Sequence, residues 1–262
     1  MDGQGRGCGM HFRELEALLA RHLRLYHHPV AVFFEDYAAD ETPEKALAPE
    51  AEAGSRLSFC QVLAHVRQVG TSVRLEPRRL SCPTAADVFG FSRQEQKAVK
   101  TLNKYVGLES AERFYQERDR FRPGSKGAVC LFPLEKCPAE PDAVIMVVDA
   151  LQAMHLLDFY AMAKDLPEIP LSHNVNGAAC ANTVKAIKRQ GPQLALPCPG
   201  AFTSGKMERG EVVLAFSWPD FQAAAAVAQS RARQAKASLL GGPQLVGNDV
   251  CRNCPLIKFK AA

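Results

Sequence analysis

The sequence predicts an α/β protein built from two related halves that together form one pseudo-symmetric globular body, with a mixed α+β arrangement as the alternative. Continuous apolar runs of strand length alternate with segments of helical periodicity. A hydrophobic fraction of 47% in 262 residues is enough for a substantial core. The same order of strand, helix, glycine and Cys-Pro recurs in both halves. These three observations predict the fold class.

The first half begins with leucines spaced for one helix face and continues with a buried strand, since its apolar run is continuous. Residues 38–55 are polar and predict a loop or a loose helix. Gly70 is the expected C-cap of the helix that Cys60 opens. The predicted elements are a helix at 12–25, a strand at 29–36, a helix at 60–70, a strand at 71–81, a mostly helical stretch at 83–120 and a strand at 126–132.

The second half follows a proline-rich joint at 137–141. Its predicted elements are a strand at 143–148, helices at 151–164 and 180–190, strands at 194–197 and 210–218, and an alanine-rich helix at 219–238. We therefore divide the chain into a disordered start (1–10), a first half (11–138), a second half (139–240) and a tail with a CxxC pair (241–262). We expect the two halves to pack as one unit.

The two halves share five features in the same order, which indicates an internal duplication. Residues 29–36 align without gaps with 142–149, and both strands end in Asp. Each half then has a helix-leading cysteine, a glycine ten or eleven residues later, and a Cys-Pro pair 22 or 18 residues after the leading cysteine. The last shared feature is a strand after a glycine, at 127–131 and 210–214.

Charge and hydropathy exclude several classes of protein. A net charge of +4 with scattered Lys and Arg gives no basis for nucleic-acid binding. No segment reaches the roughly 18 apolar residues of a membrane span. The first residues lack the apolar stretch of a secretory signal, so we expect a cytoplasmic protein.

The alignment of the halves sorts the nine cysteines. Cys130 aligns with Val213 in mid-strand and is expected in the core. The four that recur are Cys60, Cys82, Cys180 and Cys198. A cysteine at a helix N-terminus faces free N–H groups and the positive end of the helix dipole, which favour thiolate. We therefore predict one shared site built from these four side chains.

Four thiolates suit a metal centre, and Cys-Pro is a familiar ending of a cluster-ligand run. An iron–sulfur cluster is the first prediction. Zinc is the second, since structural zinc sites usually have tighter pairs than these. Cys251 and Cys254 form the one tight pair and are weaker metal-ligand candidates. The alternative is that the four cysteines serve only in packing and turns.

Four further residues are candidates for holding a ligand. Lys126 and Lys206 each precede a predicted strand, in corresponding places of the two halves, and suit an anion. Lys206 also ends a partial P-loop match, but Met207 replaces the Ser or Thr that binds Mg²⁺. His173 and Asn176 lie in a polar, turn-prone stretch before Cys180.

The pattern resembles the uncharacterised domain-of-unknown-function family 169, found largely in archaea and anaerobic bacteria. The resemblance spans roughly residues 28 to 225. It rests on Pro29-Val-Ala-Val, Cys60-Gln61, Cys82-Pro83 with Gly90-Phe91, Asp149-Ala-Leu-Gln-Ala-Met154, Gly177-Ala-Ala-Cys180 and Cys198-Pro-Gly-Ala201. The family implies no established activity, although its anaerobic bias agrees with a cluster.

Three functions follow as hypotheses. The first is an iron–sulfur or other metal-thiolate protein with a redox or ligand-activating role in small-molecule metabolism. The second is a metal-free enzyme or anion binder in which one helix-leading thiolate is the nucleophile. The third is a binding module whose cysteines only pack. A small molecule or a redox partner is the expected partner, and the sequence predicts neither a specific reaction nor an oligomeric state.

Overall fold

The computed structural model describes residues 12–37, 49–92, 107–171, 173 and 176–234. The helices are α1 (Phe12–Leu23), α2 (Phe59–Val69), α3 (Pro83–Val88), α4 (Leu108–Glu117), α5 (Ala150–Lys164), α6 (Cys180–Arg189), α7 (Pro199–Thr203) and α8 (Trp218–Gln234). The strands are β1 (Val30–Asp36), β2 (Ala51–Glu52), β3 (Val73–Leu75), β4 (Lys126–Pro133), β5 (Ala143–Asp149), β6 (Gln193–Ala195) and β7 (Glu211–Ser217). Two 3₁₀ turns lie at Pro77–Arg79 and Leu134–Lys136.

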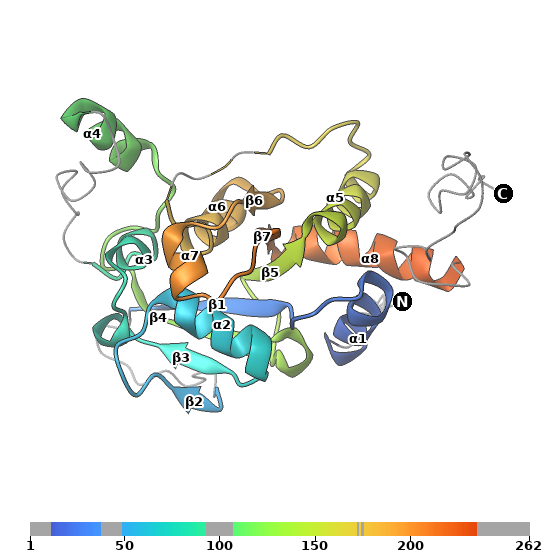
Figure 1. Ribbon diagram of the computed structural model, residues 1–262, viewed down its shortest axis with the longest axis horizontal. Helices are drawn as coiled ribbons and strands as arrows, with labels where there is room; N and C mark the ends of the chain where they lie inside the picture. Colours follow the sequence, from blue (N-terminus) through green and yellow to red (C-terminus); the bar gives the residue numbers. More distant parts are fainter. Residues whose placement is uncertain (1–11, 38–48, 93–106, 172, 174–175, 235–262) are drawn as a thin grey trace, which may run out of the picture.

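The strands form one seven-stranded sheet in the order β2-β3-β4-β1-β5-β7-β6 (Figure 1). Every pairing is antiparallel except β2 with β3. Helices and strands are therefore mixed in one protein as predicted, and the antiparallel pairing matches the α+β alternative. Strands from both halves pair in this one sheet.

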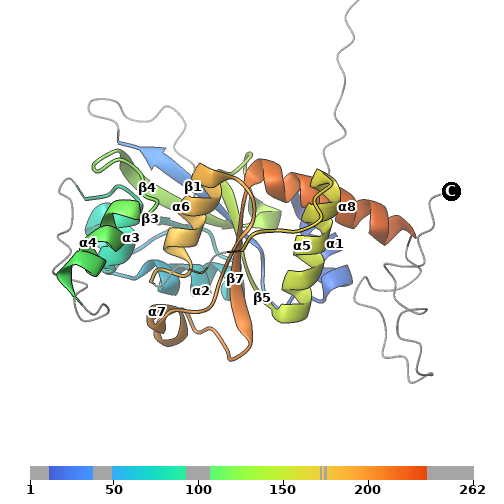
Figure 2. The same cartoon turned by 90° about the horizontal axis from the view of Figure 1, so that it is seen from above.

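Helices cover both faces of the sheet, because the strands are apolar on both sides. One core lies between the sheet and α2, α3, α6 and α7, and the strands contribute Val30, Val32, Ile145 and Val213 to it. The other core lies between the sheet and α1, α5 and α8. Figure 2 shows these two groups of helices on opposite sides of the strands.

The sheet order is mirrored about the central β1–β5 pair: β3-β4-β1 on one side corresponds to β6-β7-β5 on the other. In that pair Ala31 lies opposite Val144, Val30 opposite Ile145, and Val32 opposite Ala143. Under the alignment of 29–36 with 142–149, Ala31 and Val144 are equivalent, and the other two pairs exchange equivalent residues. Any antiparallel pairing of two aligned strands has this reciprocity, so the pairing by itself does not establish a two-fold axis. The duplication itself remains a prediction, since similar topology does not establish common origin.

Several elements differ from their sequence predictions. The strand expected at 71–81 is only Val73–Leu75 and continues as a 3₁₀ turn, because Pro77 has no N–H for a ladder. In the helical stretch expected at 83–120, the described helices are α3 and α4. The predicted disordered start, the tail with its CxxC pair, and residues 93–106 lie outside the described residues. Among the helices in the described ranges, none is long and apolar enough to cross a membrane.

Candidate functional site

The four repeated cysteines all lie at the starts of helices. Cys60 is the second residue of α2, whose N-cap Ser58 forms a reciprocal capping box with Gln61. Cys180 is the first residue of α6. Cys82 and Cys198 are the extended N-cap residues of α3 and α7, and the proline after each occupies the first helical turn. The local rules used at the sequence level therefore explain all four positions.

The fold brings the four side chains together on one face of the sheet. Cys180 belongs to the core beneath α2, α3, α6 and α7, and the other three pack against that core. Cys60 interacts electrostatically with Cys82, Cys180 and Cys198. Cys180 interacts in turn with Cys82 and Cys198. We call these four residues the four-cysteine centre.

Cys60 and Cys198 form the closest pair in this centre. The Cys60 thiol donates a hydrogen bond to the Cys198 sulfur, and this contact lowers the pKa of Cys198 to about 5 against the opposing effect of burial. The backbone N–H groups of Gly177, Ala178 and Ala201 also donate to the Cys198 sulfur. The same contact and burial raise the pKa of Cys60. These contacts favour the thiolate form at Cys198 and the protonated form at Cys60.

Cys180 is the buried member of the centre, at 3% exposure. Burial raises its pKa, and Cys82 adds to the rise, whereas Arg118 opposes it.

The turn before Cys180 requires a glycine. Gly177 has φ +84°, and a Cβ there would lie 3.1 Å from the Cys180 sulfur and 3.2 Å from Nη2 of Arg118.

Arg118 is a buried cation beside the centre. Its Nη1 lies 3.7 Å from Asp87, which also lies 3.6 Å from Nη1 of Arg120. Its Nη2 donates to the carbonyl of Asn176 at 3.3 Å, and its guanidinium lies 4.9 Å from the centre of the Phe114 ring. Because two guanidinium groups share the Asp87 carboxylate, Arg118 keeps a positive potential toward Cys180.

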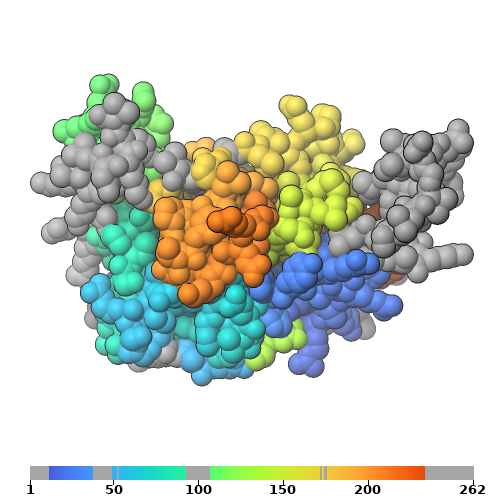
Figure 3. All heavy atoms as spheres, viewed as in Figure 1, coloured from blue at the N-terminus to red at the C-terminus, as the bar shows by residue number. Residues whose placement is uncertain are grey.

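Arg67 fixes the position of α2 against the turn after α7. Its side chain is buried, and Nη2 donates to the carbonyls of Gly205 and Lys206 at 3.1 and 2.8 Å. A Cβ on Gly205 would lie 2.6 Å from the Ala201 carbonyl oxygen and 3.2 Å from Cβ of Cys60. Figure 3 shows the segment around α7 (orange) against α2 (cyan). This packing holds Cys60 against Cys198.

The four ligand candidates do not gather together. Lys126 forms an ion pair with Asp36, and its Nζ lies 5.1 Å from the centre of the Phe121 ring. Lys206 is exposed, and its carbonyl accepts the hydrogen bond from Arg67. His173 accepts from the N–H of Leu196 at 3.3 Å.

Asn176 is the one ligand candidate that the structure places beside the four-cysteine centre. Its amide donates to the hydroxyl of Thr84 at 3.1 Å, and its carbonyl accepts from Arg118. Thr84 follows Cys82-Pro83, so this hydrogen bond joins the start of α3 to the turn that carries Gly177. In the structure Asn176 therefore makes its hydrogen bonds to other residues of the protein, Thr84 and Arg118.

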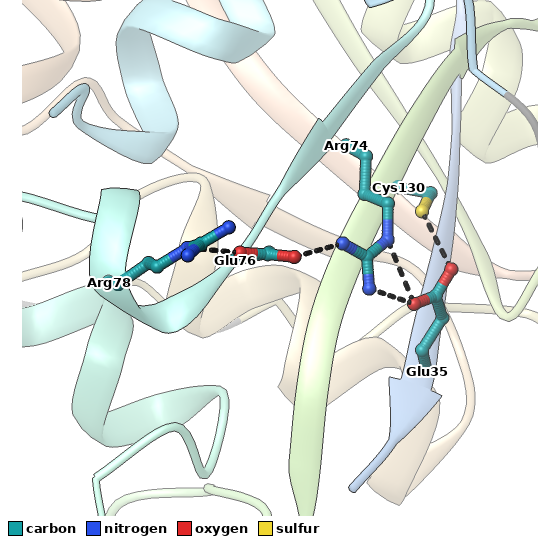
Figure 4. A network of polar contacts seen from close by, with 5 residues as sticks. All are labelled: Glu35, Arg74, Glu76, Arg78 and Cys130. Carbon is teal, nitrogen blue, oxygen red and sulfur yellow. Dashed lines mark hydrogen bonds and ion pairs between the residues drawn. The ribbon is translucent and has the colours of Figure 1, made fainter. Parts of the chain in front are cut away.

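The other cysteines lie apart from the centre. Cys130 is fully buried in β4, as the alignment predicts, on the opposite face of the sheet. Its thiol donates to Glu35, which also pairs with Arg74 at 2.8 Å (Figure 4). Cys137 donates to the Ala139 carbonyl, and burial raises its pKa to about 12. Cys8, Cys251 and Cys254 lie outside the described residues.

As they stand, the side chains do not form a ready metal site. Within the described ranges, no three or more His, Cys, Asp or Glu side chains are grouped so that they could hold a metal ion. In this structure the Cys60 and Cys198 thiols are hydrogen-bonded to each other. Loading a metal requires these side chains to move.

Sequence reasoning gave no role at the site to Arg118, Arg67, Gly177 or Gly205. Each acts through a contact between distant parts of the chain, such as Arg67 with Gly205. The available signals were weak. Arg67 lies among apolar residues of α2, and Gly177 and Gly205 occur near cysteines in both sequence and space.

The comparison with protein families agrees with the residues that carry the predicted resemblance. The family model DUF169, described as uncharacterised ArCR, matches residues 18–226. The chain belongs to DUF169. The match includes all four cysteines of the centre, as well as Arg67 and Arg118. It ends before the CxxC pair at 251–254.

No curated protein and no solved structure matches this DUF169 chain significantly. The family description names no reaction. The geometry of the four-cysteine centre is therefore the observation that bears on function.

Proposed function

We propose that this DUF169 protein has a thiol-dependent function, with Cys198 as its reactive thiolate. The observation that carries the proposal is the set of donors around one sulfur: the Cys60 thiol and the N–H groups of Gly177, Ala178 and Ala201. These donors stabilise the deprotonated form, which is the nucleophilic form of cysteine. Cys198 is also only partly buried, so a small reagent can reach it.

The chemistry that fits this site is attack by the Cys198 sulfur on an electrophilic carbon or sulfur. Cys60 carries the proton of the pair and lies in contact with the attacking sulfur. It is therefore placed to give that proton to a leaving group. Arg118 adds positive electrostatic potential at Cys180, the buried cysteine of the centre.

Site-resolved alkylation tests this proposal. The protein is treated with a limiting amount of iodoacetamide at pH 7, and each cysteine peptide is quantified by mass spectrometry. Cys198 should be labelled first, and Cys198→Ser should remove the fast phase. Cys137→Ser is the matched control, because burial raises the pKa of Cys137 and it lies outside the centre. Equal labelling rates at Cys198 and Cys137 would refute the proposal.

A second candidate function is binding of an iron–sulfur cluster by Cys60, Cys82, Cys180 and Cys198. The observation that favours it is that Cys60 interacts with the other three cysteines, and Cys180 interacts with Cys82, Cys198 and Arg118. Hydrogen bonds to cysteine sulfurs and nearby charge are also the means by which proteins tune such clusters. Its role would be redox or ligand activation in small-molecule metabolism. Zinc is the second choice of metal, since four thiolates also suit a tetrahedral ion.

Metal analysis separates the two candidates. Protein purified without air is assayed for iron, acid-labile sulfide and zinc, and its visible spectrum is recorded. A cluster predicts brown protein with matched iron and sulfide, both lost in Cys180→Ser and retained in Cys137→Ser. Colourless protein without iron or zinc, also after anaerobic reconstitution with iron and sulfide, would exclude the second candidate and leave the first.

A further inference from the structure

The Cys60–Cys198 contact joins two thiols that are 138 positions apart in the sequence. Cys60 lies at the start of α2 in the first half, and Cys198 caps α7 in the second. A contact between two sulfurs from separate elements requires those elements to be fixed against each other. The fold must therefore contain a device that holds α2 on α7.

Arg67 and Gly205 supply that device. The Arg67 guanidinium, at 1% exposure, donates to two carbonyls of the turn that follows α7. Nη1 of the same group lies 3.7 Å from Glu211 at the start of β7, so the cation is balanced. Gly205 lets the turn approach Cβ of Cys60 more closely than a side chain would allow. These contacts fix the start of α2 beside the turn after α7, where the free thiols of Cys60 and Cys198 are hydrogen-bonded to each other.

The two thiols are also chemically different. Cys198 accepts from three backbone N–H groups, and Cys60 donates to Cys198. Both are partly buried, whereas Cys180 is buried. This is the arrangement of an attacking thiolate with a second thiol beside it, the pair that thiol–disulfide exchange requires.

We propose that Cys60 and Cys198 form a reversible disulfide by exchange with low-molecular-weight disulfides, with Cys198 attacking and Cys60 resolving. This inference rests on the reactive Cys198 of the proposed function. The Cys198 thiolate attacks one sulfur of a disulfide RSSR, forms a mixed disulfide and releases RS⁻. The Cys60 sulfur then attacks Cys198 in the mixed disulfide and displaces the second RS⁻. The Cys60 proton passes to a released thiolate. The protein loses two electrons and the disulfide RSSR gains them.

Oxidised glutathione is the probe, and intact-mass and peptide mass spectrometry are the readouts. Wild-type protein should lose two hydrogens, gain no stable glutathione adduct and yield a Cys60–Cys198 cross-linked peptide. Dithiothreitol should reverse the change. Cys60→Ser should instead accumulate a stoichiometric glutathione adduct on Cys198. Cys198→Ser should do neither.

Two controls keep the outcome interpretable. Cys82→Ser removes the other partly buried thiol of the centre and should leave the Cys60–Cys198 cross-link intact. Circular dichroism shows whether Cys60→Ser is folded, and Cys60→Ala replaces it if it is not. Fast alkylation of Cys198 without a Cys60–Cys198 cross-link would overturn this inference and leave the proposed function standing. An inert Cys198 would overturn both.

Discussion

Arg67 in α2 donates a hydrogen bond from Nη2 to the carbonyl oxygen of Gly205 at 3.1 Å, across the boundary between the two halves. The donor is fully buried, and the acceptor belongs to the turn after the Cys198 helix. This one contact links the position of Cys60 to that of Cys198. The stability of the protein and the chemistry of its thiols should therefore change together when it is removed.

Arg67→Leu should lower the free energy of unfolding by about 2–4 kcal/mol, because the buried Gly205 carbonyl and the part-buried Lys206 carbonyl lose their donor and Glu211 loses a cation. It should also slow formation of the Cys60–Cys198 cross-link. Urea unfolding and the glutathione assay measure these effects. Arg78→Leu is the control: that side chain is 72% exposed, and its loss should change stability by no more than about 0.5 kcal/mol. Equal effects of the two variants would contradict the role given to Arg67.

Gly177→Ala should destabilise the protein by about 1–3 kcal/mol, since φ is +84° and the new Cβ meets both Cys180 and Arg118. The variant should also raise the pKa of Cys198, because the displaced turn carries two of its N–H donors. Thermal unfolding and the pH dependence of alkylation report the two effects. Gly54→Ala is matched to it, since nothing lies within 4 Å of a Cβ there. A wild-type pH profile in Gly177→Ala would exclude this part of the site.

The rate of Cys198 alkylation should rise with pH to a plateau, with its midpoint near the pKa of about 5. The direction follows from the nucleophile, which is present only above that pKa. Cys60→Ala removes the donor and should move the midpoint toward about 8.5, the ordinary value of a thiol. Cys60→Ser keeps an O–H donor and should hold the midpoint low. Iodoacetamide labelling of the Cys198 peptide between pH 4 and 10 measures all three midpoints, and identical values would show that Cys60 does not set the pKa.

Arg118→Met should lower the free energy of unfolding by about 3–5 kcal/mol, because it leaves the buried Asp87 carboxylate with one fewer cation. Arg120→Met is the comparison. Arg120 shares the same carboxylate, but its side chain is 19% exposed where that of Arg118 is 3% exposed, so water compensates part of the loss. Urea unfolding of both variants gives the difference directly. A larger decrease in the free energy of unfolding for Arg120→Met than for Arg118→Met would contradict the more buried position of Arg118.

Local sequence rules account for much of the fold. Ser58 with Gln61, Gly70 after α2, and proline after Cys82 and Cys198 each specify a helix end through contacts only a few residues apart. The continuous apolar runs identify β1, β4, β5 and β7. The strand predicted at 194–197 overlaps β6, whereas β2 has only two residues, too few for periodicity to reveal it.

The candidate site was predictable as a set of residues but not as a geometry. The internal alignment selected Cys60, Cys82, Cys180 and Cys198, and placed Cys130 in the core. It could not show that Cys60 donates to Cys198, or that Arg118 lies beside Cys180, because those contacts depend on how the halves pack. It also suggested Lys126 as an anion ligand, whereas the structure pairs that lysine with Asp36.

The reciprocal pairing of β1 with β5 has a consequence for any truncated form of this chain. A cut between Cys137 and Asp142 would leave each fragment with one apolar strand edge that lacks its neighbour, and such edges invite association. Each fragment would also carry two of the four thiols, Cys60 and Cys82 or Cys180 and Cys198, so the Cys60–Cys198 pair would be divided between the fragments. Neither fragment would therefore hold all four cysteines. Mixing the two fragments should restore the fast alkylation of Cys198 only to the extent that β1 pairs again with β5.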